Sequence, residues 1–130
     1  MAEKSGGANP LARQGGLSYL EIPAVDPGKS AAFYEQVFGW KIDRRAPGDI
    51  RFSDGGGLLV GRWAGDRVAF REPGLLPVIY VDELDLAVSR AAANGGEIVK
   101  SPYVEGDVRV ARIRDPAGNV MGLWQFAQRG

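Results

Sequence analysis

A phenol and a carboxylate, Tyr19 and Glu21, are the side chains of this sequence best placed to do chemistry together. Both lie in a largely apolar segment, residues 17–24, whose pattern predicts a β-strand. Residues two positions apart in a strand point to the same face of a sheet. Glu21 could then act as a general base and Tyr19 as a general acid or oxyanion donor, which would suit a lyase or isomerase reaction.

Two residue types that often serve in catalysis and metal binding are absent, because the 130 residues include no histidine and no cysteine. This composition excludes thiol nucleophiles, disulfides, thiolate metal sites and an acyl-transfer triad. It also removes the commonest transition-metal ligand. A chain without cysteine is compatible with a reducing compartment, and we expect a cytoplasmic location.

The charges of the chain balance, with sixteen basic and sixteen acidic residues. No long-range field is therefore expected that would attract nucleic acid or an anionic membrane surface. The apolar runs are also far shorter than a membrane span. The composition favours a small-molecule ligand, with neither a nucleic acid nor a membrane as partner.

The elements that must position these residues occur twice, with a period of about 56 residues. In each repeat an apolar strand ends at an acid, Asp26 or Asp82, and a helix follows that ends at a glycine 13 residues later, Gly39 or Gly95. The acid predicts a helix N-cap and the glycine a left-handed helix end. Three short strands follow each helix, so the repeat predicts an α+β fold of two βαβββ modules in tandem. The predicted boundaries are a mobile tail at 1–15, one domain at 16–127 with modules 16–63 and 76–126, a crossover loop at 64–75 and a flexible rim at 101–106.

Four short motifs together resemble the vicinal oxygen chelate superfamily, which includes glyoxalase I, extradiol dioxygenases, fosfomycin-resistance enzymes and bleomycin-resistance proteins. They are Glu21-Ile22-Pro23-Ala24-Val25-Asp26, Phe33-Tyr34, Val37-Phe38-Gly39-Trp40 and Asp115-Pro116-Ala117-Gly118-Asn119. The resemblance implies curved mixed sheets around a cleft and a homodimer. We interpret the last motif as a hairpin turn that orients the final strand, with Gly118 or Asn119 at positive φ.

Metal-dependent members of that superfamily hold a divalent ion with His, Gln or Glu on the first and last strands of each module. The corresponding positions here fall on Tyr19, on Leu76 or Leu75, near Gly61 and on Gly122. A catalytic ion needs about three protein donors, and only Tyr19, with Glu21 as a replacement, could donate. We therefore expect no metal and no other cofactor.

Strand alternation assigns the remaining side chains to faces. Tyr19 and Glu21 are predicted on the cleft face, with Leu20 and Ile22 toward the helix. The same alternation places two indoles, Trp63 and Trp124, on the cleft face, where ligand contact and packing in the core or at a subunit interface are equally expected. The full predicted ligand-contacting set is Tyr19, Glu21, Arg51, Trp63, Leu76, Val78, Tyr80, Gly122 and Trp124.

An inventory of aromatic walls with few polar groups is typical of a ligand pocket. The leading interpretation is a glyoxalase/bleomycin-resistance-like protein that binds or sequesters a small aromatic or amphipathic molecule in the cleft between its two modules, without metal. The first alternative is a lyase or isomerase that uses Glu21 and Tyr19, with or without a divalent ion. The second is a protein-interaction module that presents the segments 64–75 and 101–106.

Overall fold

Two βαβββ modules follow one another along the chain in the computed structural model, which describes residues 10–70, 72 and 74–127. The first comprises β1 (Tyr19–Pro23), α1 (Pro27–Phe38), β2 (Lys41–Ala46), β3 (Asp49–Ser53) and β4 (Val60–Ala64). The second comprises β5 (Val78–Tyr80), α2 (Leu84–Ala93), β6 (Glu97–Glu105), β7 (Val108–Arg114) and β8 (Val120–Phe126). The predicted fold class is confirmed. Residues 1–9, most of the predicted tail, lie outside the described residues.

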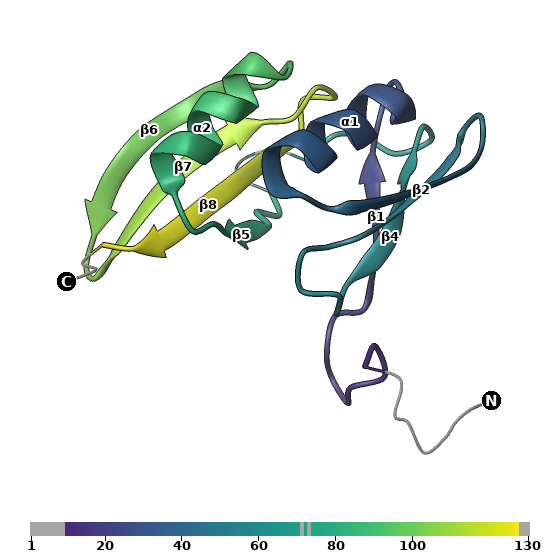
Figure 1. The fold of residues 1–130 in the computed structure, drawn as a ribbon, viewed down its shortest axis with the longest axis horizontal. Helices are drawn as coiled ribbons and strands as arrows, with labels where there is room; N and C mark the ends of the chain where they lie inside the picture. Colours follow the sequence, from purple (N-terminus) through teal and green to yellow (C-terminus); the bar gives the residue numbers. More distant parts are fainter. Residues whose placement is uncertain (1–9, 71, 73, 128–130) are drawn as a thin grey trace.

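Each module builds a four-stranded mixed sheet, with strand orders β1-β4-β3-β2 and β5-β8-β7-β6. The first strand of each module pairs in parallel with the last, and the other pairs are antiparallel. The helices α1 and α2 lie next to each other, and the two sheets extend from them in different directions (Figure 1). None of the described helices is long and apolar enough to cross a membrane.

The helix α1 begins and ends as its sequence predicts. The Asp26 carboxylate accepts hydrogen bonds from the backbone N–H groups of Gly28 and Lys29, at 3.1 and 3.3 Å. Pro27 takes the first helical position, where no N–H is needed. Gly39 ends the helix in the left-handed conformation, at φ 71°.

The predicted cap of the second helix was wrong. The N-cap of α2 is Glu83, one residue after Asp82, and its side chain makes no capping hydrogen bond. Instead the Gln125 side chain of β8 accepts a hydrogen bond from the Leu84 N–H at 2.8 Å and donates one to the Asp82 carbonyl. Gln125, which is distant in sequence, thus makes the hydrogen bond to the helix N-terminus that Asp82 was predicted to make.

The predicted flexible rim at 101–106 was also wrong. Strand β6 continues through this segment to Glu105, and its pairing with β7 is irregular around Pro102. β6 is an edge strand, where a proline removes no hydrogen bond that the sheet needs. The turn comes later, at Gly106, which has a φ of 66°.

A single apolar core joins the two modules. Its densest part is a group of aromatic rings in the first module, in which Trp40 stacks between Tyr34 and Phe52 at centroid distances of 4.6 and 4.7 Å. The α1 ring of Phe33 reaches the second module, because a Cβ added to Gly96 would lie 2.8 Å from it. The ring thus packs directly on the backbone at the start of β6.

A buried polar network also joins the modules, and it centres on the predicted hairpin turn of residues 115–119. The Tyr34 hydroxyl of α1 donates to the Asp115 carboxylate at 2.8 Å. The Asn119 amide donates to that carboxylate and to the Pro23 carbonyl, each at 2.8 Å, and accepts from the Phe70 N–H. Gly118 has the positive φ that the turn prediction requires, at 94°. Burial raises the pKa of Asp115. It also raises the pKa of Tyr34 well above its ordinary value, and the neighbouring Asp115 charge raises the Tyr34 pKa further.

We expect replacement of Asn119 by alanine to destabilise both modules together, since three buried or part-buried hydrogen bonds are lost, including the one that crosses the junction to the Pro23 carbonyl. The expected loss is about 2–4 kcal/mol of unfolding free energy, measured by denaturant unfolding. The matched control is Asn94→Ala, which removes one exposed hydrogen bond to the Arg90 carbonyl and should cost less than about 1 kcal/mol. Equal losses in the two variants would show that the network is not the junction we describe.

Candidate functional site

Each sheet has a helix on one face, and we refer to the other as its open face. Strand pairing identifies the residues of the first open face, because Glu21 lies opposite Arg62 and Arg62 opposite Arg51. On the second sheet Tyr80 lies opposite Trp124, which lies opposite Val110. Residues paired across neighbouring strands share a face, so each set lies on one side of its sheet.

The predicted alternation of β1 is confirmed. Tyr19 and Glu21 lie on the open face, whereas Ile22 is fully buried and Leu20 packs against the core. The alternation of β5 is confirmed as well, because Ile79 packs against the core.

Of the alternatives for Trp63, ligand contact was wrong and core packing is confirmed. Its exposed fraction is 0%, and its ring packs against Tyr34 and Phe52 beneath α1. The companion glycine, Gly61, faces the same way, and a Cβ there would lie 1.9 Å from the Leu20 carbonyl oxygen. The assigned faces of β4 were shifted by one residue, which inverts every side chain. Because of this shift, Arg62 was not predicted on the open face. Its charge, between the apolar Gly61 and Trp63, was the signal that could have identified its position.

Gly122 and Leu76 were also predicted to contact ligand, and the structure places both differently. Gly122 is buried, and a Cβ there would lie 3.1 Å from a Val78 methyl. The Val78 side chain therefore covers the glycine that was expected to admit a ligand. Leu76 is half-buried but lies before β5, outside the sheet register.

Glu21 is held by basic side chains rather than free. Its carboxylate accepts hydrogen bonds from Arg67 Nε at 2.9 Å, from Arg62 Nε at 3.2 Å and from the Tyr19 hydroxyl at 3.4 Å. The hydrogen bond from Arg67 is the main reason why the pKa of Glu21 is lowered. Burial opposes it, and the charges of Arg62 and Arg67 lower the pKa further. A general base is more effective with a pKa nearer the working pH. The geometry therefore gives no support to Glu21 as a catalytic base.

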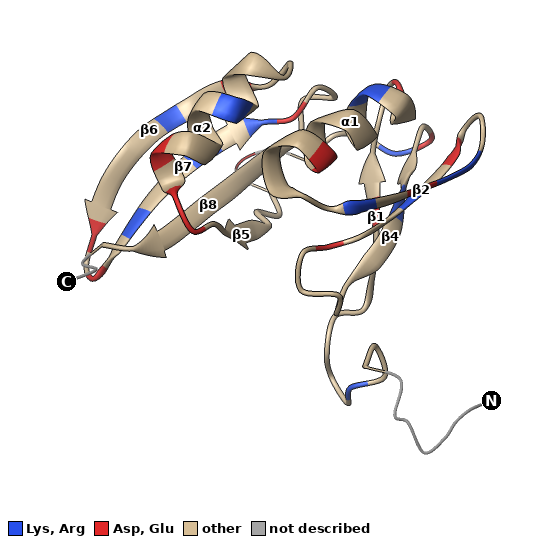
Figure 2. Ribbon diagram, in the orientation of Figure 1, with Lys and Arg blue, Asp and Glu red and all other residues tan. Residues whose placement is uncertain are grey.

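The predicted anion contact Arg51 is paired as well, with Asp49 at 3.0 Å. It lines a small hollow of about 330 Å³ together with Tyr19 and Lys41. Acidic and basic residues are interspersed along the first sheet (Figure 2).

The four positions at which metal-dependent relatives hold their ion do not fit a divalent cation here. They carry a phenol, a leucine and two glycines, and the one nearby carboxylate, Glu21, is bound by two guanidinium groups. Within the described part of the chain no three acidic side chains converge as a metal site would require. We therefore derive no chemical step through a metal.

The second open face is aromatic. Trp124 makes edge-to-face contacts with Tyr80 and Phe126, at centroid distances of 5.0 and 5.1 Å. Tyr80 is 44% exposed, Phe126 45% and the neighbouring Val78 53%. We call these four residues the aromatic row. Such an exposed apolar surface on a sheet commonly marks a contact site.

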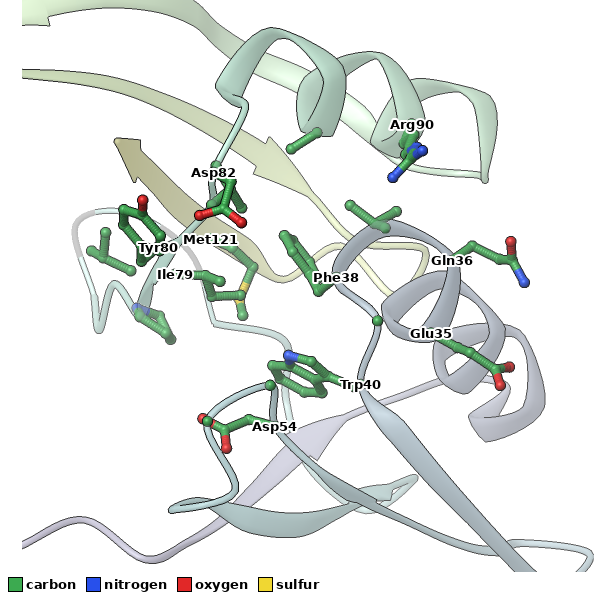
Figure 3. Close-up of a pocket in the computed structure, with 18 of the residues that line it drawn as sticks. Glu35, Gln36, Phe38, Trp40, Asp54, Ile79, Tyr80, Asp82, Arg90 and Met121 are labelled. Carbon is green, nitrogen blue, oxygen red and sulfur yellow. The ribbon is translucent and has the colours of Figure 1, made fainter. Parts of the chain in front are cut away.

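A larger hollow, of about 960 Å³, lies between the two modules (Figure 3). It is bounded by the end of α1, the β3–β4 turn, β5 and the first turns of α2. Figure 3 shows Phe38 and Trp40 on one side and Ile79, Met121 and Asp82 on the other. Most of its lining was not predicted, because apolar residues such as Phe38 and Trp40 also belong to the core and the angle between the modules brings the rest together. We call it the junction hollow.

Comparison with known proteins identifies the class. The chain matches the Glyoxalase/Bleomycin resistance protein/Dioxygenase superfamily over residues 16–123. This match covers most of the chain, so the protein belongs to that superfamily, as the motif resemblance predicted.

Curated relatives include CFP32 of Mycobacterium bovis, whose name marks it as a suspected glyoxylase and which is 31% identical over 126 residues. The match covers 87% of this chain and 46% of that protein, so the chain spans about half of the relative's length. A glyoxylase-like domain-containing protein of Didymella fabae is 31% identical over 90 residues, which are 64% of this chain and 70% of that protein.

Solved structures show the same fold. A glyoxalase/bleomycin resistance protein/dioxygenase family enzyme from Burkholderia phytofirmans PsJN aligns with a TM-score of 0.67 at 25% identity, covering 82% of this chain and 95% of that one. TioX from Micromonospora sp. ML1 aligns with a TM-score of 0.64 at 21% identity, covering 85% and 98% of the two chains.

We expect Glu21 to titrate below the ordinary range of a glutamate, because two guanidinium groups favour its charged form. Its contribution to stability is then present above the unfolded-state pKa and is lost as the pH falls through the lower folded-state pKa. Replacement of Arg67 by glutamine should raise the pKa of Glu21 toward the ordinary value, as read from its side-chain carboxyl ¹³C shift. A Glu21 pKa above the ordinary value would contradict the ion pairs and restore the general-base hypothesis.

Proposed function

We propose that the protein binds or sequesters a small aromatic or amphipathic molecule at its open faces, without a metal. The observation that supports this most directly is the aromatic row, an uncovered set of rings and a valine on a sheet face. Stacked and edge-on aromatic contacts give affinity to flat apolar ligands. The polar row of the first sheet, Tyr19, Glu21 and Arg62, would supply the few orienting groups that such sites need.

We propose that the protein acts as a homodimer. The two open faces of one chain belong to sheets that extend in different directions, so a single copy does not enclose a ligand between them (Figure 1). In a symmetric pair the aromatic row of one copy would face the polar row of its partner, and two equal clefts would form. A cytoplasmic location is part of the same proposal and is based on the lack of cysteine.

Binding should be visible through Trp124. The other two tryptophans, Trp40 and Trp63, are buried in the core, so an aromatic ligand on the open face should change mainly the Trp124 emission. We expect saturable changes on titration with members of a panel of aromatic compounds and antibiotics. In Trp124→Phe the emission change should disappear, and affinity by calorimetry should fall about three- to tenfold. A panel without any saturable binding would refute the proposal.

The dimer should depend on the aromatic row. We expect Phe126→Glu to shift the protein toward monomer in sedimentation velocity, because it places a charge in the apolar centre of the proposed contact. The matched control is Val104→Glu, which changes an exposed valine on the helix-facing side of the second sheet. A wild-type protein that is monomeric at high concentration would exclude the proposed cleft between copies.

A further inference from the structure

The junction hollow is a second place where a small molecule could be held, on the side of the sheets opposite the open faces. Its volume of about 960 Å³ is at the upper end of the usual range for small-molecule sites, roughly 300–1,000 Å³. The residues that line it from β1, β5 and β8 include Leu20, Ile79 and Met121, which face the helices. The hollow is therefore separate from the site of the proposed function, although Val78 and Tyr80 border both.

The rim of the hollow is predominantly acidic. Four acidic residues border it, Glu35, Asp54, Asp82 and Glu83, against one basic residue, Arg90. The acidic segment between β5 and α2 is plain in Figure 2. Glu35 points away from the hollow and lies 3.5 Å from Arg44.

The two carboxylates at the start of α2 are not neutralised by neighbours. Asp82 and Glu83 form no ion pair with any residue that the structure describes, whereas Asp85 nearby pairs with Arg109 at 3.0 Å. Arg90 lines the hollow from the other end of α2. The negative charge beside β5 is thus available to a ligand.

The wall opposite supplies apolar surface and a hydrogen-bond donor. The Trp40 ring has Tyr34 on one face and Phe52 on the other, so it presents an edge to the hollow. Its indole N–H has no hydrogen-bond partner among the described residues, and it is not one of the buried unpartnered atoms, which are Ser30 Oγ and Trp63 Nε1. Figure 3 shows Phe38 next to this edge.

From this arrangement we infer that the junction hollow binds an organic cation, an ammonium group on an apolar and preferably aromatic body. The ammonium group lies beside Asp82 and Glu83, where its charge complements theirs. The apolar body lies against Phe38, Ile79 and the edge of Trp40, and the indole N–H donates to an acceptor on the ligand where one is present. Neutral and anionic molecules of the same size lack the first of these interactions.

Three probes of matched shape test the charge preference: naphthylmethylamine, naphthylmethanol and naphthylacetate. Binding is followed by backbone amide shifts of the wild-type protein at neutral pH. We expect the amine to shift residues 38–40 and 79–82 saturably, with affinity about fivefold or more above that of the alcohol, and the acetate to bind most weakly. Added salt should weaken amine binding and leave alcohol binding unchanged.

Two variants separate the charge from the cavity. Asp82→Asn should lower amine affinity about three- to fivefold and leave alcohol affinity unchanged. Asp107→Asn, at the exposed β6–β7 turn, is the matched control and should change neither. Leu86→Trp, which places a large ring at the exposed α2 side of the hollow, should weaken all three probes. Native amide spectra of each variant confirm that it is folded.

Three results would overturn the inference. They are equal affinity for amine, alcohol and acetate, shifts confined to the open faces around Tyr19 or Trp124, and amine binding that Asp82→Asn and Leu86→Trp leave intact. An absence of all binding would also overturn it. If Leu86→Trp in addition dissociates a dimer, a second copy of the chain covers the hollow. Because Trp124→Phe leaves the junction hollow unchanged, loss of the proposed open-face function is distinguishable from loss of this site.

Discussion

The arrangement of the two modules depends on one buried carboxylate. Asp115 accepts the Tyr34 hydroxyl from the first module and the Asn119 amide from its own turn, and Asn119 extends the network to the Pro23 carbonyl at the end of β1. All four residues are buried, so a missing partner would leave a buried polar atom unpaired. Hydrogen bonds are directional, so the network constrains the angle between the modules in addition to the apolar packing that they share.

That angle creates both candidate sites. The network joins the modules where the 115–119 turn meets α1 and the end of β1. Away from that junction the modules diverge, which leaves the junction hollow between Trp40 and β5. The same divergence keeps the open faces of the sheets from meeting within one chain. A cleft between open faces then needs a second copy, whereas the junction hollow is formed by a single chain.

The features that local sequence determines were predicted, and those that distant residues determine were not. Asp26 and Gly39 delimit α1 by hydrogen bonds within a few residues, and the alternation at Tyr19 and Leu20 follows from strand geometry. The second helix start depends on Gln125, which is about 40 residues away. The face of Trp63 depends on the register of β4 with β1, which no local pattern specifies.

The candidate sites were less predictable than the fold for the same reason. Predicted contacts such as Tyr80 and Trp124 do lie together, because they are opposite each other on neighbouring strands. Arg62 and Arg67, which decide the charge state of Glu21, were not recognised, and Arg67 comes from the loop after β4. A cleft between the modules was predicted, but most of the residues that line the junction hollow could not be, since they depend on the angle between modules.

Two observations explain why the proposed function includes no metal. At one metal position of the relatives, Gly122, the Val78 side chain fills the space that a ligand side chain would need. Beside another, Tyr19, the nearest carboxylate is already bound by two guanidinium groups at hydrogen-bond distance. A divalent ion there would have to displace both arginines and would gain a single carboxylate, far short of the donors that a catalytic ion requires. An apolar molecule that binds the aromatic row displaces neither arginine, which is why we favour ligand binding over inherited metal chemistry.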